Sequence, residues 1–158
     1  MSTGVTVTFN GNGADTVEPA TKYIEYPALM YGDLAVATRA GYIFDGWFLT
    51  PNEDAIEVFA ESEVQSWANH TLYAHWVVAC TVTLDGNGGG TPSPSSLVLA
   101  VGGSYGTALT DAVVTREGYA FAGWYTAASG GDLVDADSVV PAEAHTLYAH
   151  WNVIFAVT

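Results

Sequence analysis

Apolar and polar residues alternate along short segments of this chain, and a period of two predicts β-strands. The segments recur in the same order in each half of the sequence and form matched pairs: residues 5–9 and 80–84, 22–26 and 96–101, 42–49 and 119–126, and 71–76 and 146–151. Between the last two strands of each half, residues 60–67 and 135–140 are expected to form a short helix or one helical turn. The pattern therefore predicts a mainly β (α+β) fold.

The two halves are copies of one sequence unit. The seven residues His70–Trp76 recur without change as His145–Trp151, at an offset of 75. Gly11–Gly13 recurs as Gly86–Gly88 at the same offset. Both of these Gly-Asn-Gly segments follow a predicted strand, and glycine is the residue that most readily adopts the positive φ of a tight turn.

A third shared motif strengthens the repeat. Arg, Gly, Tyr, Phe, Gly and Trp occur with identical spacing from Arg39 and again from Arg116. Ordered self-similarity of this kind indicates tandem copies of one structural unit. We therefore predict a first module over residues 5–76 and a second over residues 77–151, with residues 152–158 as the start of a third repeat strand or a C-terminal tail.

Composition restricts the possible partners. The chain has 3 basic residues (Lys22, Arg39 and Arg116) against 17 acidic ones, a formal net charge of −14. Binding to nucleic acid or to an anionic membrane requires clustered basic side chains, so we expect neither partner. No apolar run reaches the length of a membrane-spanning helix, and we predict no membrane insertion by this chain. Cys80, the single cysteine, is expected to be a small apolar residue on a strand.

The residues most often used for catalysis or metal binding form no convincing site. All four histidines belong to the duplicated closing motif: His70, His75, His145 and His150. Five residues of separation along a strand places the two of each pair on opposite faces, which favours a structural role. Asp132, Asp135 and Asp137 form an oxygen-rich cluster that suits Ca²⁺, but Asp135 as the cap of a helical turn is the preferred interpretation. We therefore predict no catalytic, cofactor-binding or metal-binding residues.

Aromatic residues offer the remaining candidate contact. Four of the five tryptophans occupy repeated positions, as expected of core residues in a small domain. Trp67 is the exception, because it aligns with an alanine in the second copy. If an aromatic side chain contacts a ligand, Trp67 is the candidate.

The motifs together resemble the Listeria–Bacteroides repeat, the B-repeat family first named from internalins. The likeness extends from about Val5 to Trp151 and includes the opening strand with its turn, the Arg-Gly-Tyr-Phe-Gly-Trp motif and the closing heptapeptide, each present twice. The resemblance implies tandem β-grasp, ubiquitin-like modules, each a small mixed sheet with one short helix or helical turn. It implies no catalytic residue, so the chain is not expected to be an enzyme.

The resemblance also implies a function and a location. The family serves mainly as a non-catalytic stalk or spacer in large bacterial surface proteins, so we expect an extracellular protein of the cell surface or cell wall, or a secreted one. A monomer without cofactors, whose partners are neighbouring repeats of the same chain, fits that role. The alternative is a ligand-binding module for a glycan or a host protein, which would act through exposed loops and aromatics.

Overall fold

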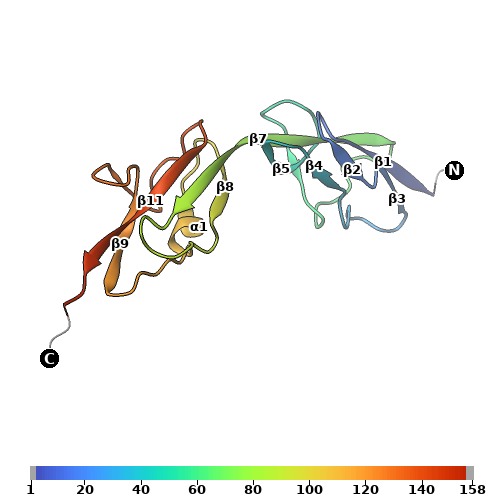
Figure 1. Ribbon diagram of the computed structural model, residues 1–158. Coiled ribbons are helices and arrows are strands. Elements are labelled where there is room, and N and C mark those ends of the chain that lie inside the picture. The colour runs from blue at the N-terminus through green and yellow to red at the C-terminus, as the bar shows by residue number, and fades with distance from the viewer. Residues whose placement is uncertain (1–2, 156–158) are drawn as a thin grey trace. The chain divides into compact units, whose positions relative to one another are not determined.

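The computed structural model describes residues 3–155, and the chain divides into two compact units with a boundary between Val77 and Val78. The regular secondary structure of each unit is almost entirely β-strand (Figure 1). Each also has its own cluster of buried apolar side chains, so hydrophobic burial stabilises each from within. The mainly β fold predicted from the sequence is confirmed.

The first unit contains a mixed sheet and a separate small one. In spatial order, the strands of the mixed sheet are β3 (Thr21–Glu25), β1 (Gly4–Asn10), β7 (His70–Asp85), β5 (Tyr42–Phe48) and β6 (Glu57–Val58). β1 pairs with β3 in the antiparallel sense and with the first part of β7 in the parallel sense. The small sheet consists of β2 (Thr16–Glu18) and β4 (Val36–Thr38).

The second unit repeats the order of the mixed sheet, with the last part of β7 as its opening strand. The order is β8 (Ser96–Ala100), β7, β11 (His145–Val153), β9 (Tyr119–Tyr125) and β10 (Leu133–Val134). β8 is antiparallel to β7, and β11 is parallel to it. A five-residue helix, α1 (Gly106–Thr110), lies between β8 and β9 in the sequence (Figure 1).

Alternation along the strands builds both cores. In β1, Val5, Val7 and Phe9 are buried while Thr8 between them is exposed. The second unit buries the corresponding residues of β7, among them Cys80 as a small apolar side chain. The third strand of each unit adds a buried tryptophan, Trp47 or Trp124, which packs edge-to-face against a phenylalanine three residues earlier.

Backbone geometry explains why the fifth residue type of the Arg-Gly-Tyr-Phe-Gly-Trp motif, its second glycine, is glycine in both units. Gly46 has φ +147° and Gly123 has φ +131°, which side-chain-bearing residues rarely adopt. At Gly123, a Cβ atom would lie 2.8 Å from Leu133 Cδ1 on β10. The pairing of β9 with β11 also shifts register between His150 and Trp151, beside this glycine. The motif thus encodes a bulged strand.

The predicted positions of the helices are wrong. Residues 60–67 and 135–140 form turns and bends, and α1 occurs earlier, before the third strand of the second unit. The described residues of the first unit contain no helix. The Ser62 and Ser138 hydroxyls accept hydrogen bonds from the backbone N–H groups of Phe59 and Asp135, at 2.9 and 3.0 Å. Such local side-chain bonds favour turns over helices.

The remaining predicted elements differ in outcome. All eight predicted segments form strands, but residues 71–76 and 80–84 belong to one continuous strand, β7. The two- and three-residue strands β2, β4, β6 and β10 are not predicted, because a period cannot be recognised in so few residues. Residues 152–158 are predicted to begin a third repeat strand or to form a tail. Strand β11 ends at Val153, and residues 156–158 lie outside the described residues, so this remains a prediction.

Candidate functional site

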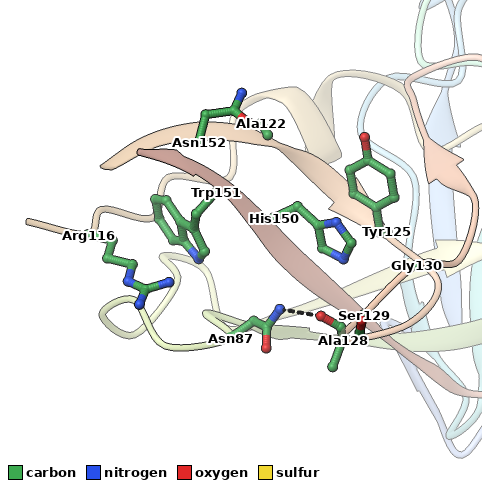
Figure 2. A pocket seen from close by; sticks show the side chains of 10 residues that line it. All are labelled: Asn87, Arg116, Ala122, Tyr125, Ala128, Ser129, Gly130, His150, Trp151 and Asn152. Carbon is green, nitrogen blue, oxygen red and sulfur yellow. Dashed lines mark hydrogen bonds between the residues drawn. The ribbon is translucent and has the colours of Figure 1, made fainter. Parts of the chain in front are cut away.

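The second unit has a pocket beside β11, with a volume of ≈ 460 Å³ (Figure 2). That volume lies within the range of small-molecule sites. Its walls come from the turn after β7, the segment before β9, the loop after β9, and the strands β9 and β11. The lining residues are Asn87, Arg116, Ala122, Tyr125, Ala128, Ser129, Gly130, His150, Trp151 and Asn152.

Asn87 ties the walls of this pocket together. It has φ +43° in the glycine-rich turn, and its side-chain N–H₂ donates to the carbonyl oxygens of Ala128 and Ala149 at 2.8 and 2.9 Å. The indole N–H of Trp151 donates to the carbonyl oxygen of Gly86 at 3.0 Å. These bonds attach turn and loop to β11, so the pocket is preformed.

Arg116 supplies the positive charge of the pocket. Its guanidinium carbon lies 3.8 Å from the ring centroid of Tyr119, a cation–π geometry. It also lies beside Gly88, where a Cβ atom would be 3.4 Å from it. Among the described residues the guanidinium has no hydrogen-bond or ion-pair partner. Its five N–H donors are therefore available to a ligand.

His150 forms another wall and is fixed by two contacts. Its ring stacks on Tyr125, with centroids 3.9 Å apart and planes inclined by 10°. Its Nε2 lies 2.9 Å from the carbonyl oxygen of Ala127. Because a carbonyl only accepts, Nε2 carries the hydrogen, and in the neutral ring Nδ1 remains an acceptor.

The first unit has a corresponding pocket of ≈ 580 Å³, lined by Asn12, Arg39, Asp45, Pro51, Glu53, His75 and Trp76. Its asparagine, arginine, histidine and tryptophan are the repeat counterparts of those in the second unit. Arg39 likewise lies 3.7 Å from the ring centroid of Tyr42. The difference is charge, because Asp45 and Glu53 stand where the second pocket has Ala122 and Gly130.

The other two histidines lie elsewhere and pair with buried tyrosines. His145 Nδ1 lies 2.9 Å from the carbonyl oxygen of Glu143, so its Nε2 accepts from the Tyr105 hydroxyl at 2.6 Å. His70 and Tyr31 repeat the pair in the first unit, at 2.9 Å. Burial raises the pKa of both tyrosine phenols. His75 stacks on Phe48, and its Nε2 lies 3.0 Å from the carbonyl oxygen of Thr50. Each histidine of the chain therefore has a defined contact within its own unit, consistent with the structural role favoured above.

Cys80 lies close to one of these pairs. Its Sγ is 3.7 Å from His145 Nδ1 and donates to the Glu143 carbonyl oxygen at 3.3 Å. Burial raises the pKa of the thiol, so the unreactive protonated form is favoured.

The acidic cluster is organised by hydrogen bonds to one carboxylate. Asp135 Oδ1 accepts from the backbone N–H groups of Asp137 and Ser138 and from the Ser138 hydroxyl, at 2.8–3.1 Å. The Ser138 hydroxyl contributes most to lowering the pKa of Asp135. Asp132 is not part of this turn, since its N–H bonds to Thr126 Oγ1. Within residues 3–155, no three His, Cys, Asp or Glu side chains are grouped to hold a metal ion.

Trp67, the predicted ligand contact, is 43% exposed and packs edge-to-face on Tyr26 with centroids 5.8 Å apart. It lies outside both pockets described above. Its role in binding remains a prediction.

The repeated geometry agrees with a known family. A family model described as the Listeria–Bacteroides repeat domain matches residues 6–75 and again residues 81–150. The chain belongs to the Listeria–Bacteroides repeat domain family. The resemblance noted from the sequence motifs is confirmed, including the two tandem copies.

Two relatives place these repeats in longer proteins. The chain is 30% identical over 150 residues to a protein of Evansella cellulosilytica named "Putative membrane protein", covering 94% of this chain and 21% of the relative. It is 32% identical over 118 residues to Internalin H of Listeria monocytogenes, covering 73% of this chain and 20% of the relative. The chain thus spans about a fifth of the length of these relatives. In the described part of the chain, no helix is long and apolar enough to cross a membrane.

The paired pockets of these repeats were not foreseen from the sequence. Their walls come from segments more than sixty residues apart, such as Asn87 and His150. One signal was available, because two of the three basic residues, Arg39 and Arg116, recur at equivalent positions.

Proposed function

We propose that the chain is a non-catalytic, load-bearing spacer from a bacterial repeat protein that is secreted or attached to the cell surface. Family membership and the relatives in much longer proteins support this role. The observation that carries it is the parallel pairing of the opening strand of each unit with its closing strand.

Parallel pairing determines how a unit responds to tension along the chain. In the first unit, β1 pairs with β7 from Val7 opposite His70 to Asn10 opposite Tyr73. A pull on the start of β1 and on the end of that unit acts in opposite directions along the strands. All the hydrogen bonds between the two strands are then loaded together in shear, whereas an antiparallel terminal pair would open one bond at a time. The second unit has the same pairing, between β7 and β11.

Single-molecule force spectroscopy of the whole chain, held at its two ends, tests this function. We expect two separate unfolding events, because each unit has its own core. Each event should release at most about 280 Å, the extended length of one unit of about 77 residues. Both should require high force, since resistance to pulling is governed by the unfolding barrier.

A proline placed in β1 provides the sharpest variant. Thr6 N–H donates to Asn69 Oδ1, on the β7 side, and Phe9 N–H donates to Ala20 O, on the β3 side. Because successive N–H groups alternate in direction, Thr8 N–H faces β7. Thr8→Pro removes that donor without removing a buried side chain. It should lower the unfolding force of the first unit and leave that of the second, the internal control, unchanged.

Val58→Ala is the matched control outside the clamp. It removes buried apolar volume on β6 and should cost about 1–2 kcal/mol of stability with little loss of force. Low forces in the unmodified chain, or equal force losses in Thr8→Pro and Val58→Ala, would contradict the load-bearing role.

We also infer that each unit is a β-grasp module, as the family resemblance implies. Support comes from the strand order. In the first unit the opening strand β1 and the closing strand β7 lie side by side and parallel, with β3 beside β1 and β5 beside β7. Nuclear Overhauser contacts between the Val7 and His70 segments, and between the Val82 and His145 segments, are the expected solution signature. Their absence would remove this assignment.

A further inference from the structure

We propose that the pocket of the second unit, around Arg116 and Trp151, binds an acidic saccharide through a sugar carboxylate. This binding is separate from the spacer role and does not rest on it. The charge and the hydrogen-bonding groups of the pocket each restrict the ligand.

The charge of the pocket favours an anion. Arg116 lines it without an ion-pair partner among the described residues, and no lining residue is acidic. Asp85 and Glu117, which are close to lining residues in the sequence, are not part of the lining. An arginine guanidinium matches a carboxylate with two parallel hydrogen bonds. Since the chain as a whole carries a net charge of −14, attraction of an anion here must come from this local charge.

Two of the remaining polar groups, Asn87 and His150, favour a ligand that also donates hydrogen bonds. The amide nitrogen of Asn87 is already used by Ala128 and Ala149, which leaves its carbonyl oxygen as an acceptor with no hydrogen-bond partner among the described residues. His150 presents Nδ1, also an acceptor, because Nε2 is bound to Ala127. A bare anion offers no hydrogen to either group. A sugar acid offers both the carboxylate for Arg116 and hydroxyl donors for the two acceptors.

Figure 2 shows the indole of Trp151 between the side chains of Arg116 and His150. An aromatic side chain in a polar pocket gives the apolar face of a sugar ring a surface to contact. The volume of ≈ 460 Å³ leaves room for a small saccharide rather than a folded partner. Charge, acceptors and aromatic surface thus converge on one ligand class.

The first unit supplies a natural comparison. Its pocket keeps the asparagine, arginine, histidine and tryptophan but adds Asp45 and Glu53. Two carboxylates oppose the charge of Arg39, so this pocket should reject an acidic sugar. The second unit therefore holds the binding pocket, and the first unit holds a corresponding pocket that should not bind.

Titration of the whole chain with sodium glucuronate, followed by ¹H–¹⁵N NMR at physiological salt, tests the assignment. We expect a saturable shift of the Trp151 indole N–H signal at millimolar concentrations, with the Trp76 indole signal unmoved. Glucose, which lacks the carboxylate, and acetate, which lacks the sugar hydroxyls, should each bind at least about tenfold more weakly, the loss expected when one set of strong hydrogen bonds is missing.

Three variants separate binding from folding. Arg116→Gln should weaken glucuronate binding at least about tenfold, while the matched Arg39→Gln change in the first unit should leave it unchanged. Ala122→Asp introduces the carboxylate that Asp45 supplies in the first pocket. It should weaken glucuronate binding and leave the backbone spectrum unchanged. This variant keeps the test decisive if Arg116→Gln does not fold. A Trp151 signal that does not move, acetate binding as tight as glucuronate binding, or an equal response of Trp76 would overturn the proposal. The force experiment does not involve this pocket, so the two proposals fail independently.

Discussion

The two buried repeat tryptophans offer a matched test of how much one hydrogen bond contributes to these cores. Trp47 and Trp124 are 2% and 3% exposed, and each packs edge-to-face on a phenylalanine of its own strand. The indole N–H of Trp47 donates to the carbonyl oxygen of Ala35 at 2.7 Å. The indole N–H of Trp124 is buried with no hydrogen-bond partner among residues 3–155. Replacing each by phenylalanine removes the same atoms but changes hydrogen bonding in opposite directions.

The magnitude follows from that difference. Both changes remove the same ring atoms, so most of this cost cancels in the comparison. Trp47 also packs edge-to-face on Phe9, with centroids 4.9 Å apart, and the loss of that contact adds to the cost of Trp47→Phe. Trp47→Phe also leaves a buried carbonyl oxygen without its donor, which costs about 1–3 kcal/mol. Trp124→Phe removes a buried donor that is already unsatisfied, which returns about 1–3 kcal/mol. We therefore expect Trp47→Phe to destabilise its unit by at least about 2 kcal/mol more than Trp124→Phe destabilises the other.

Amide hydrogen exchange measured by NMR gives the free energy of unfolding separately for each unit. The slowest amides of β1 and β5 report on the first unit, and those of β9 and β11 on the second. In each variant the unmutated unit serves as the reference, because its exchange should not change. Equal costs for the two substitutions, or a larger cost for Trp124→Phe, would refute this account of the two cores.

Three further results are expected. Burial raises the pKa of Tyr31, so the folded state disfavours the phenolate. The contribution of Tyr31 to the unfolding free energy should be constant below pH about 10 and fall as the pH rises further, and Tyr31→Phe should reduce this fall in urea titrations at increasing pH. Hydrogen bonds lower the pKa of Asp135, so its stabilising effect should persist above the ordinary aspartate pKa and disappear as the pH falls through the lowered value. Ser138→Ala should raise that pKa in a ¹³C carboxyl titration, and an unchanged value would exclude the Ser138 hydroxyl as its main cause. Gly118 has φ +78° with open space around it, so Gly118→Ala should cost about 1 kcal/mol of stability in thermal unfolding. Gly123→Ala should cost more, because its new Cβ atom would meet a leucine side chain on β10. The reverse order of the two costs would contradict the bulge geometry.

The linear sequence determined much of this protein by itself. The duplicated heptapeptide and the alternation of apolar residues specify two copies of a β-rich unit, because a strand that buries one face must place an apolar residue at every second position. The motif from Arg39, repeated from Arg116, carries glycines whose backbone conformations few other residues adopt. Such local signals can be recognised without knowledge of the fold, and they indicated the family as well as the strands.

Only the tertiary structure decided where helix and pocket lie. The two predicted helical segments bond to distant parts of their own units instead: Tyr31 N–H donates to the Ser62 carbonyl oxygen at 3.0 Å, and Tyr105 N–H donates to the Ser138 carbonyl oxygen at 3.1 Å. Periodicity along the chain does not record such long-range bonds. The pocket requires Asn87 and Arg116 to meet Trp151 on β11, and this happens because the closing strand lies parallel to the opening strand. Pairing of strands distant in sequence places these side chains together, and neither residue type nor spacing along the chain contains that information.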